Sequence, residues 1–222
     1  MINYATVASC QIPGLAELYT KHFPRPGTFV EIGAYDGYTY SNTATLPDYG
    51  WKGVLAEPIK EYAYMCRDRF LNKPVQVVEE AVGDFEGDVE ITVAGPLSTA
   101  KPNESLYTFE QAGNTEVLEA LQQATLRLVP ATTLESLLVR TRIEPIFELL
   151  VVDVEGMEWD IFKNFHLAKW SPRMIIVEMH EESPEWQDVV WHDNEHLNDY
   201  FQNNFYQKIY KDEINTIFLY GV

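Results

Sequence analysis

The sequence predicts a single α/β domain built on a mostly parallel sheet. Short apolar runs alternate with amphipathic segments from residue 28 to residue 79, and the same alternation resumes after residue 148. Parallel strands need long crossover connections, usually helices, so this order is typical of a parallel sheet with helices packed on its faces. A length of 222 residues suits one such domain with a well-buried core.

Five apolar runs are predicted as buried strands, because glycine, proline or charged residues end them. They cover residues 28–32, 52–56, 75–79, 149–153 and 174–178. Helical spacing of apolar residues predicts helices around and between them, at about 15–22, 39–46 (weakly), 59–70, 157–165 and 197–205. Residues 206–210 and 216–220 are predicted to close the sheet as an antiparallel hairpin, which gives seven strands.

Residues 84–131 interrupt the alternation and are predicted to form a small β-rich insertion. Strands are expected there at 88–93, 105–109 and 125–129, with a loop at 95–104. Thr132 and Glu135 fit a capping box that would begin the next helix. The insertion is too small for a core of its own, so residues 1–222 are expected to form one domain.

The charge balance excludes some partners. Lysine and arginine number 16 against 34 aspartate and glutamate residues, which gives 16 − 34 = −18. Phosphate-rich partners require basic surfaces, so neither nucleic acid nor an anionic membrane is expected as a partner. The simplest interpretation of the excess negative charge is solubility.

Targeting and redox features point to a cytoplasmic protein. The first residues show no basic stretch followed by an apolar run, and no stretch approaches the ~20 apolar residues that span a bilayer. Cys10 and Cys66 are far apart and have no paired-cysteine context, so neither a zinc site nor a disulfide framework is expected. Nothing in the sequence indicates an oligomeric state.

A glycine-containing motif follows the first predicted strand. It runs Glu31-Ile-Gly33-Ala-Tyr35-Asp36-Gly37, and ligands of open α/β sheets bind at this end of the strands. Glycine lets the backbone approach a ligand, and a carboxylate can accept from the ammonium group of an amino-acid-like ligand. Alternatively, the segment is an ordinary strand-to-helix turn.

Two further acidic positions follow the second and third strands. Glu57 stands 20 residues after Gly37, where a carboxylate can accept hydrogen bonds from ribose hydroxyls. Capping the next helix is the alternative role for Glu57. Glu80 and Ala81 stand where an adenine ring would lie, although Glu80 could equally face solvent.

The fourth and fifth strands end in a group of titratable residues. Asp153 and Glu155 follow one strand, and Glu178 and His180 end the other. Because buried charges are costly without partners, we expect these side chains to bind substrate or cofactor or to move a proton, with His180 as the leading general base. A divalent cation held by Asp153, Glu178 and His180 is an open alternative, as is simple capping of the following helix.

Six segments in this order resemble the FkbM family of S-adenosylmethionine-dependent methyltransferases: FVEIGAYDG, VLAEP, EEAVGD, TTLESLL, LLVVDVEGMEWDIF and IIVEMH. The resemblance runs from about residue 28 to residue 180, and Asp-x-Glu-Gly after a buried strand is its most specific part. The predicted order of elements, with its terminal hairpin, is also that of the Rossmann-like methyltransferases.

The resemblance implies a class I methyltransferase fold, S-adenosylmethionine as cofactor, and O-methylation of a sugar-like hydroxyl. It implies that Glu31, Gly33 and Gly37, with Tyr35 and Asp36 between them, surround the amino-acid part of the cofactor. It likewise assigns Glu57 to the ribose, Glu80 and Ala81 to adenine, and Asp153 and Glu155 to the reacting end. Family members often carry Asp where Glu31 stands and Asn where Tyr35 stands.

The acceptor would be chosen outside these motifs, so residues 1–27 and 84–131 are predicted to form the wall or lid of its pocket. Two other functions remain open: a binding protein of the same fold without catalysis, and a nicotinamide-dependent oxidoreductase. Tyr35 occupies the position of the second glycine in the dinucleotide motif G-x-G-x-x-G, which counts against the oxidoreductase.

Overall fold

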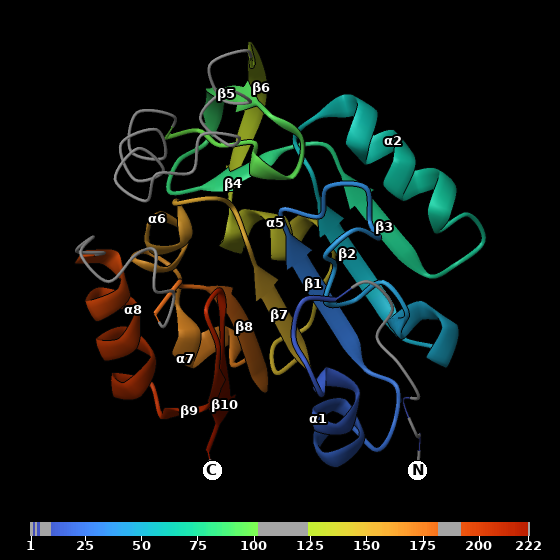
Figure 1. The fold of residues 1–222 in the computed structure, drawn as a ribbon, viewed down its shortest axis with the longest axis vertical. Coiled ribbons are helices and arrows are strands. Elements are labelled where there is room, and N and C mark those ends of the chain that lie inside the picture. Colours follow the sequence, from blue (N-terminus) through green and yellow to red (C-terminus); the bar gives the residue numbers. More distant parts are fainter. Residues whose placement is uncertain (1, 3, 5–9, 102–123, 182–191, 222) are drawn as a thin grey trace.

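A computed structural model describes residues 2, 4, 10–101, 124–181 and 192–221 of the chain. A seven-stranded sheet in the order β3-β2-β1-β7-β8-β10-β9 forms its centre (Figure 1). Its strands are β1 (Thr28–Ile32), β2 (Lys52–Ala56), β3 (Val75–Val78), β7 (Leu149–Val152), β8 (Met174–Glu178), β9 (Tyr206–Lys211) and β10 (Asn215–Tyr220). All seven strands predicted from the sequence are confirmed within one or two residues.

The strand order reverses between β1 and β7. The chain steps outward from β1 to β2 and β3, then returns to place β7 on the other side of β1, and these neighbours are parallel. β8 continues the parallel part, whereas β10 runs antiparallel to both β8 and β9. The predicted α/β class with an antiparallel terminal hairpin is therefore confirmed. In such sheets the reversal point opens a crevice beyond the carboxyl ends of the strands.

Helices cover both faces of the sheet (Figure 1). Alternate residues of a strand face opposite sides, and accordingly Phe29 and Val30 of β1 belong to different core clusters. The cluster around Phe29 includes residues of α1 (Leu15–His22) and α2 (Lys60–Arg69). The cluster around Val30 includes residues of α5 (Leu134–Arg140), α6 (Glu158–Phe162), α7 (Leu167–Trp170) and α8 (His192–Asn203).

The helix expected at 39–46 is absent, and that prediction is wrong. The segment forms turns that lead into a short 3-10 helix, η1 (Leu46–Tyr49). Ser41 and Thr43 turn their hydroxyls toward the buried carboxylate of Glu31. Serine, threonine and asparagine favour such local hydrogen bonds over helix formation, which explains the loop.

The predicted cap of α5 is displaced by one residue. Thr133, rather than Thr132, is the N-cap, and its hydroxyl oxygen accepts a hydrogen bond from the Ser136 amide at 3.2 Å. Thr132 lies inside a strand, and its hydroxyl donates to Glu86 instead. The strand β6 (Thr125–Thr133) extends beyond its alternating apolar residues, so α5 begins one residue later than the capping box predicted.

A second, three-stranded sheet lies beyond the carboxyl ends of the parallel strands (Figure 1). It consists of β4 (Ala81–Gly83), β5 (Gly87–Val93) and β6 (Thr125–Thr133), in the order β4-β6-β5. The strands predicted at 88–93 and 125–129 are confirmed, whereas residues 105–109 lie outside the described residues. Ile91 and Val129 pack against Ile59 at the start of α2, so this sheet is joined to the main one by an apolar contact.

No helix within the described ranges 10–101, 124–181 and 192–221 is long and apolar enough to cross a membrane.

The contact between β1 and β7 at the reversal point depends on Gly33. A side chain there would place its Cβ 1.7 Å from the carbonyl oxygen of Asp153, and the residue has φ +83°. Gly156 also has positive φ (+102°), but a Cβ there meets nothing within 4 Å. Gly156→Ala should therefore cost about 1–2 kcal/mol of unfolding free energy, from the backbone conformation alone.

Gly33→Ala should cost more than about 3 kcal/mol, because the two strands must also separate. Urea unfolding followed by circular dichroism would measure both losses. Equal losses for the two variants would show that the close approach of the strands does not determine stability.

Candidate active site

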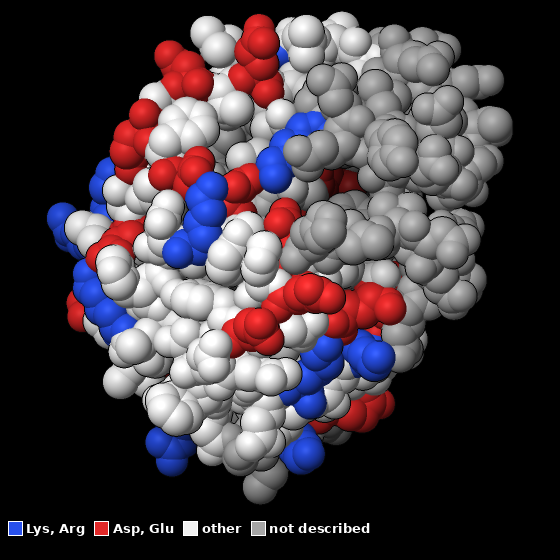
Figure 2. All heavy atoms as spheres, turned by 90° about the vertical axis from the view of Figure 1, so that its left-hand side faces the viewer, with Lys and Arg blue, Asp and Glu red and all other residues white. Residues whose placement is uncertain are grey.

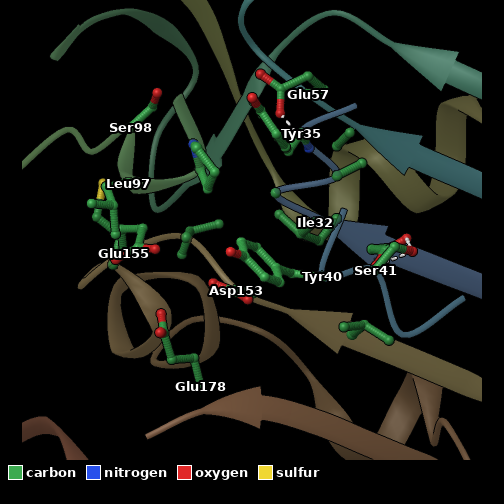
Figure 3. Close-up of a pocket in the computed structure, with 18 of the residues that line it drawn as sticks. Ile32, Tyr35, Tyr40, Ser41, Glu57, Leu97, Ser98, Asp153, Glu155 and Glu178 are labelled. Atoms are coloured by element: carbon green, nitrogen blue, oxygen red, sulfur yellow. Dashed lines mark hydrogen bonds between the residues drawn. The ribbon is translucent and has the colours of Figure 1, made fainter. Parts of the chain in front are cut away.

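A cavity of about 600 Å³ opens at the carboxyl ends of the parallel strands. Figure 3 shows Glu57 and Tyr35 on one side of it and the carboxyl groups of Asp153, Glu155 and Glu178 on another. Strand β5 of the small sheet and the segment that follows this strand form the facing wall. Its lining residues are Ile91, Gly95, Pro96, Leu97, Ser98 and Ala100. Most sequence-predicted site residues therefore line one cavity.

The leading segment contributes little to this cavity. Gln11 is the only lining residue from the described part of residues 1–27. Leu15 and Tyr19 of α1 are buried in the core on one face of the sheet. Of the two segments predicted to border the pocket, the insertion does so and α1 does not.

Glu31 is a buried carboxylate that organises the loop after β1. It accepts hydrogen bonds from the hydroxyls of Ser41 (3.0 and 3.1 Å) and Thr43 (2.5 Å) and from the backbone of Asn42. Burial outweighs these bonds and raises its pKa to about 7. Glu31 lines the cavity, but its oxygens are already engaged by its own loop.

Of the other residues in the motif after β1, some line the cavity and others hold the loop in shape. Gly33 and Tyr35 line the cavity, whereas Asp36 and Gly37 are not among the lining residues. Asp36 accepts from the amides of Tyr38 (2.8 Å) and Thr39 (2.7 Å), which closes a turn. Gly37 packs against α2 with φ +72°. These two residues shape the loop that Gly33 and Tyr35 present.

Glu57 joins the first two strand ends. Its carboxylate accepts from the Tyr35 amide and from the Ile59 amide, both at 2.8 Å, and 5% of the residue is exposed. Burial raises its pKa to about 7. Glu57 supports the start of α2, as the capping interpretation expects, and it also lines the cavity, whereas its contact with a ribose stays a prediction.

Glu80 and Ala81 follow the third strand and both line the cavity. The Glu80 carboxylate, however, forms an ion pair with Arg140 of α5, with one hydrogen bond at 3.0 Å. That carboxylate therefore has a protein partner already. Three further lining residues, Ala81, Val82 and Ile91, are apolar, and we refer to them together as the apolar slot.

Two contacts that no local sequence pattern indicates hold the wall segment, residues 95–100. The rings of Tyr35 and Tyr62 meet edge to face with centroids 4.5 Å apart, and the Tyr62 hydroxyl has a hydrogen bond with the Gly95 backbone. The Thr99 hydroxyl donates to the Glu155 carbonyl at 2.8 Å. The wall segment is thus attached near both of its ends, through Gly95 to Tyr62 of α2 and through Thr99 to the backbone of Glu155.

Tyr40 is a lining residue that sequence reasoning missed. Its φ is +62°, half of it is exposed, and in Figure 3 its ring projects into the cavity between the two groups of carboxylates. A backbone conformation so unusual for tyrosine cannot be read from local sequence.

Asp153 and Glu178 form a coupled pair of carboxyl groups. Burial and the neighbouring Glu178 charge raise the pKa of Asp153 well above its usual range. Burial also opposes ionisation of Glu178, but His180 outweighs it and lowers the pKa of Glu178. Asp153 therefore holds the proton and donates it in a hydrogen bond to the Glu178 carboxylate.

His180 contacts this pair from the far side of Glu178. Its Nε2 lies 2.8 Å from the Glu178 carboxylate, and the residue has a further hydrogen bond with the Glu213 backbone. Burial lowers the pKa of the imidazole, but the charge of Glu178 and the hydrogen bonds to Glu178 and Glu213 together outweigh it, so the net shift is upward. The protonated form of His180 is the favoured one.

Glu155 completes the cluster. Burial and the charges of Glu178 and Asp153 raise its pKa well above the usual range, and its φ is +56°. Its amide donates to the Glu178 carboxylate, whereas its own carboxyl accepts no hydrogen bond from the described residues. Of the three carboxyl groups, that of Glu155 is the one left for a ligand.

Glu158 supports the turn between β7 and α6, and the sequence analysis did not identify it. Its carboxylate accepts from the amides of Val154 (3.0 Å) and Gly156 (3.1 Å), and burial raises its pKa to about 7. An acidic residue in the first turn of a helix was the available signal.

A metal ion would find different ligands from those expected. Among the described residues, the group whose ligand atoms lie within 4.8 Å of one another is Asp153, Glu155 and Glu178. His180 is outside this group, because its ring faces Glu178. An all-oxygen set of this kind suits Mg²⁺ or Mn²⁺ rather than Zn²⁺.

The excess negative charge is not gathered in one patch on the face that Figure 2 shows. Acidic and basic side chains are interspersed there with uncharged surface. This distribution agrees with a general role in solubility.

A parallel sheet whose strand order reverses between β1 and β7, a glycine turn at that point and a terminal antiparallel hairpin form the fold of the Rossmann-like methyltransferases. The chain belongs to the FkbM methyltransferase family, because the family model described as "Methyltransferase FkbM domain" matches residues 31–208. Family membership implies S-adenosylmethionine as cofactor, and it favours a methyltransferase over a nicotinamide-dependent oxidoreductase.

Solved structures share the fold at low identity. The METTL16 methyltransferase domain is 10% identical with a TM-score of 0.51, over 94% of this chain and 65% of that one. WbdD, solved with a kinase inhibitor, is 13% identical with a TM-score of 0.50, over 97% of this chain and 42% of that one.

A TehB-like SAM-dependent methyltransferase from Corynebacterium glutamicum is 11% identical with a TM-score of 0.47, over 95% and 89% of the two chains. No curated protein sequence matches this chain.

The buried carboxyl of Glu31 should make stability depend on pH. Its pKa is about 7 in the folded chain against 4.5 as the usual value, so the folded state holds a proton that the unfolded state loses. Its contribution is complete below pH 4.5 and disappears as the pH rises through 7, by at most about 3 kcal/mol.

Urea unfolding at pH 5 and pH 7.5 would measure this dependence. The fall in unfolding free energy should be smaller in Glu31→Gln than in the unsubstituted chain, whereas the exposed control Glu90→Gln should leave it unchanged. An equal fall in all three proteins would contradict the assignment.

Proposed function

We propose that this protein transfers the methyl group of S-adenosylmethionine to a hydroxyl of a sugar-like small molecule. One observation carries the proposal. The same cavity has Glu57, the residue predicted to bind a ribose, on one side and the acidic cluster of Asp153, Glu155 and Glu178 on the other. Methyl transfer is an in-line displacement at a carbon already activated by the sulfonium, so holding donor and acceptor in line provides much of the acceleration.

In the proposed arrangement the cofactor runs along the carboxyl ends of β1 and β2. Glu57 accepts from the ribose hydroxyls with lone pairs that its two backbone hydrogen bonds leave available. The adenine ring occupies the apolar slot of Ala81, Val82 and Ile91. The amino-acid part follows the Gly33 turn, and the methyl group points toward Asp153 and Glu155.

A sugar hydroxyl is a poor nucleophile until it loses its proton, so an oxygen acceptor needs a base. Glu155 supports that role best, because its carboxyl is without a hydrogen-bond partner among the described residues. Its raised pKa means that it must first lose its own proton, after which it is a stronger base than an ordinary carboxylate. Asp153 is engaged in a hydrogen bond with Glu178, and Glu178 is paired with His180.

In this scheme the acceptor proton passes to a carboxylate oxygen of Glu155 as the C–O bond forms and the C–S bond breaks. His180 becomes a positioning residue, which keeps Glu178 charged and so fixes Asp153 and the Glu155 backbone. A protein of this fold that only bound the cofactor would not need these buried charges next to the methyl group.

The cofactor site is tested by Glu57→Ala. Loss of the ribose contacts should weaken binding of S-adenosylmethionine and S-adenosylhomocysteine by about 1.5–3 kcal/mol, or roughly 10- to 150-fold. Isothermal titration calorimetry would measure both affinities. Glu79→Ala removes an exposed carboxylate at the end of the next strand, outside the cavity, and should change neither affinity. Unchanged affinity in Glu57→Ala would remove Glu57 from the ribose site.

The base is tested by the pH dependence of turnover to S-adenosylhomocysteine in the presence of acceptor. Because the pKa of Glu155 is raised, its base form becomes more abundant as the pH rises, and kcat should rise with it. Glu155→Gln should lower kcat by about 10²–10⁴-fold and abolish this rise. In His180→Ala, kcat should still rise with pH, but the midpoint of that rise should lie at a different pH.

Two results would contradict this assignment. A flat pH profile with an equally large loss in His180→Ala would make His180 the base. Loss of activity in EDTA with recovery on adding Mg²⁺ or Mn²⁺ would show instead that Asp153, Glu155 and Glu178 hold a metal ion that activates the hydroxyl.

A further inference from the structure

The cavity is lined by acidic residues without basic partners inside it. Seven carboxyl residues line it: Glu31, Glu57, Glu80, Asp153, Glu155, Glu178 and Glu213. No lysine or arginine is among the lining residues, and His180 is the single histidine there. The His180 ring is directed to Glu178, so it neutralises a protein charge rather than facing a ligand.

The segments outside the described residues cannot supply the missing cation. Residues 102–123 and 182–191 contain no lysine or arginine, and neither do the undescribed positions at the two ends of the chain. All 16 basic side chains therefore belong to described residues. Two basic residues beside the cavity already have acidic partners: Lys101, which follows the lining residue Ala100, pairs with Asp160, and Arg140 pairs with the lining residue Glu80.

The backbone amides that could bind an anion are also engaged. Strand-to-helix turns usually offer free amides to phosphate groups. Here Glu158 accepts from the amides of Val154 and Gly156, and Glu57 accepts from those of Tyr35 and Ile59. The protein's own carboxylates thus occupy the places where a phosphate would bind.

We propose, building on the function above, that the acceptor is an uncharged hydroxyl-bearing molecule and that phosphate- or carboxylate-bearing acceptors are excluded. An anionic group entering the cavity would meet carboxyl groups and no lysine or arginine to compensate its charge, which disfavours its binding. Sugar phosphates and nucleotide-linked sugars would then not be methylated. A sugar would reach this protein only after a transferase or phosphatase step has removed its phosphate.

The test separates possible acceptors by charge. A small-molecule extract of the producing cells is passed over an anion-exchange resin, and each fraction is incubated with the full chain and methyl-labelled S-adenosylmethionine. The unretained fraction should take up at least about 100-fold more label than the retained fraction. Label mainly in the retained fraction would overturn the inference.

Calorimetry with S-adenosylmethionine is run first, because absence of cofactor binding would instead refute the proposed function.

A binding measurement tests whether the cavity excludes anions even if neither fraction is labelled. The chain saturated with S-adenosylhomocysteine is titrated with inorganic phosphate and followed by ³¹P nuclear magnetic resonance. No saturable binding is expected up to millimolar phosphate, whereas Glu213→Lys, which places a cation at the exposed rim, should create it. Glu144→Lys makes the same charge change on an exposed residue outside the cavity and should not.

Saturable phosphate binding by the unsubstituted chain would overturn the inference. Absence of any gain in Glu213→Lys would also do so, because the lack of a cation would then not be what excludes anions.

Discussion

The close approach of β1 and β7 at Gly33 is the contact on which the site depends. The Asp153 amide donates to the Ile32 carbonyl, and the Asp153 carbonyl lies where any Cβ of residue 33 would stand. Two loops from distant parts of the sequence are thereby held against each other. One of them carries the predicted cofactor contacts and the other the acidic cluster, so the distance between these two groups of residues is set by a backbone contact.

The loops around this contact are organised by the protein's own carboxylates. Glu31, Glu57 and Glu158 each accept hydrogen bonds from nearby amides or hydroxyls, and each is buried. Charged acceptors make stronger hydrogen bonds than neutral ones, which favours them as loop organisers. Burial, however, raises all three pKa values to about 7, so the loops are held by groups that titrate near neutral pH.

The same arrangement sets the electrostatics of the cavity. S-adenosylmethionine has a positive sulfonium, and an acidic lining stabilises that charge until the methyl group leaves. The His180–Glu178–Asp153 network limits the repulsion among the carboxyl groups by placing one proton and one cation among them. In the complex that we propose, the same lining that favours the cationic donor disfavours an anionic acceptor.

The sequence by itself determined the strands, most helices and the positions of the motif residues, because apolar periodicity and turn residues are local signals. It failed at residues 39–46, where the buried Glu31 draws the Ser41 and Thr43 hydroxyls away from a helix. Only the tertiary structure decided which partners the predicted site residues have. Arg140, 60 residues along the chain, engages Glu80, and Asp153 just after β7 shares a hydrogen bond with Glu178 on the neighbouring strand. Such pairings follow from how distant segments pack, which no local pattern records.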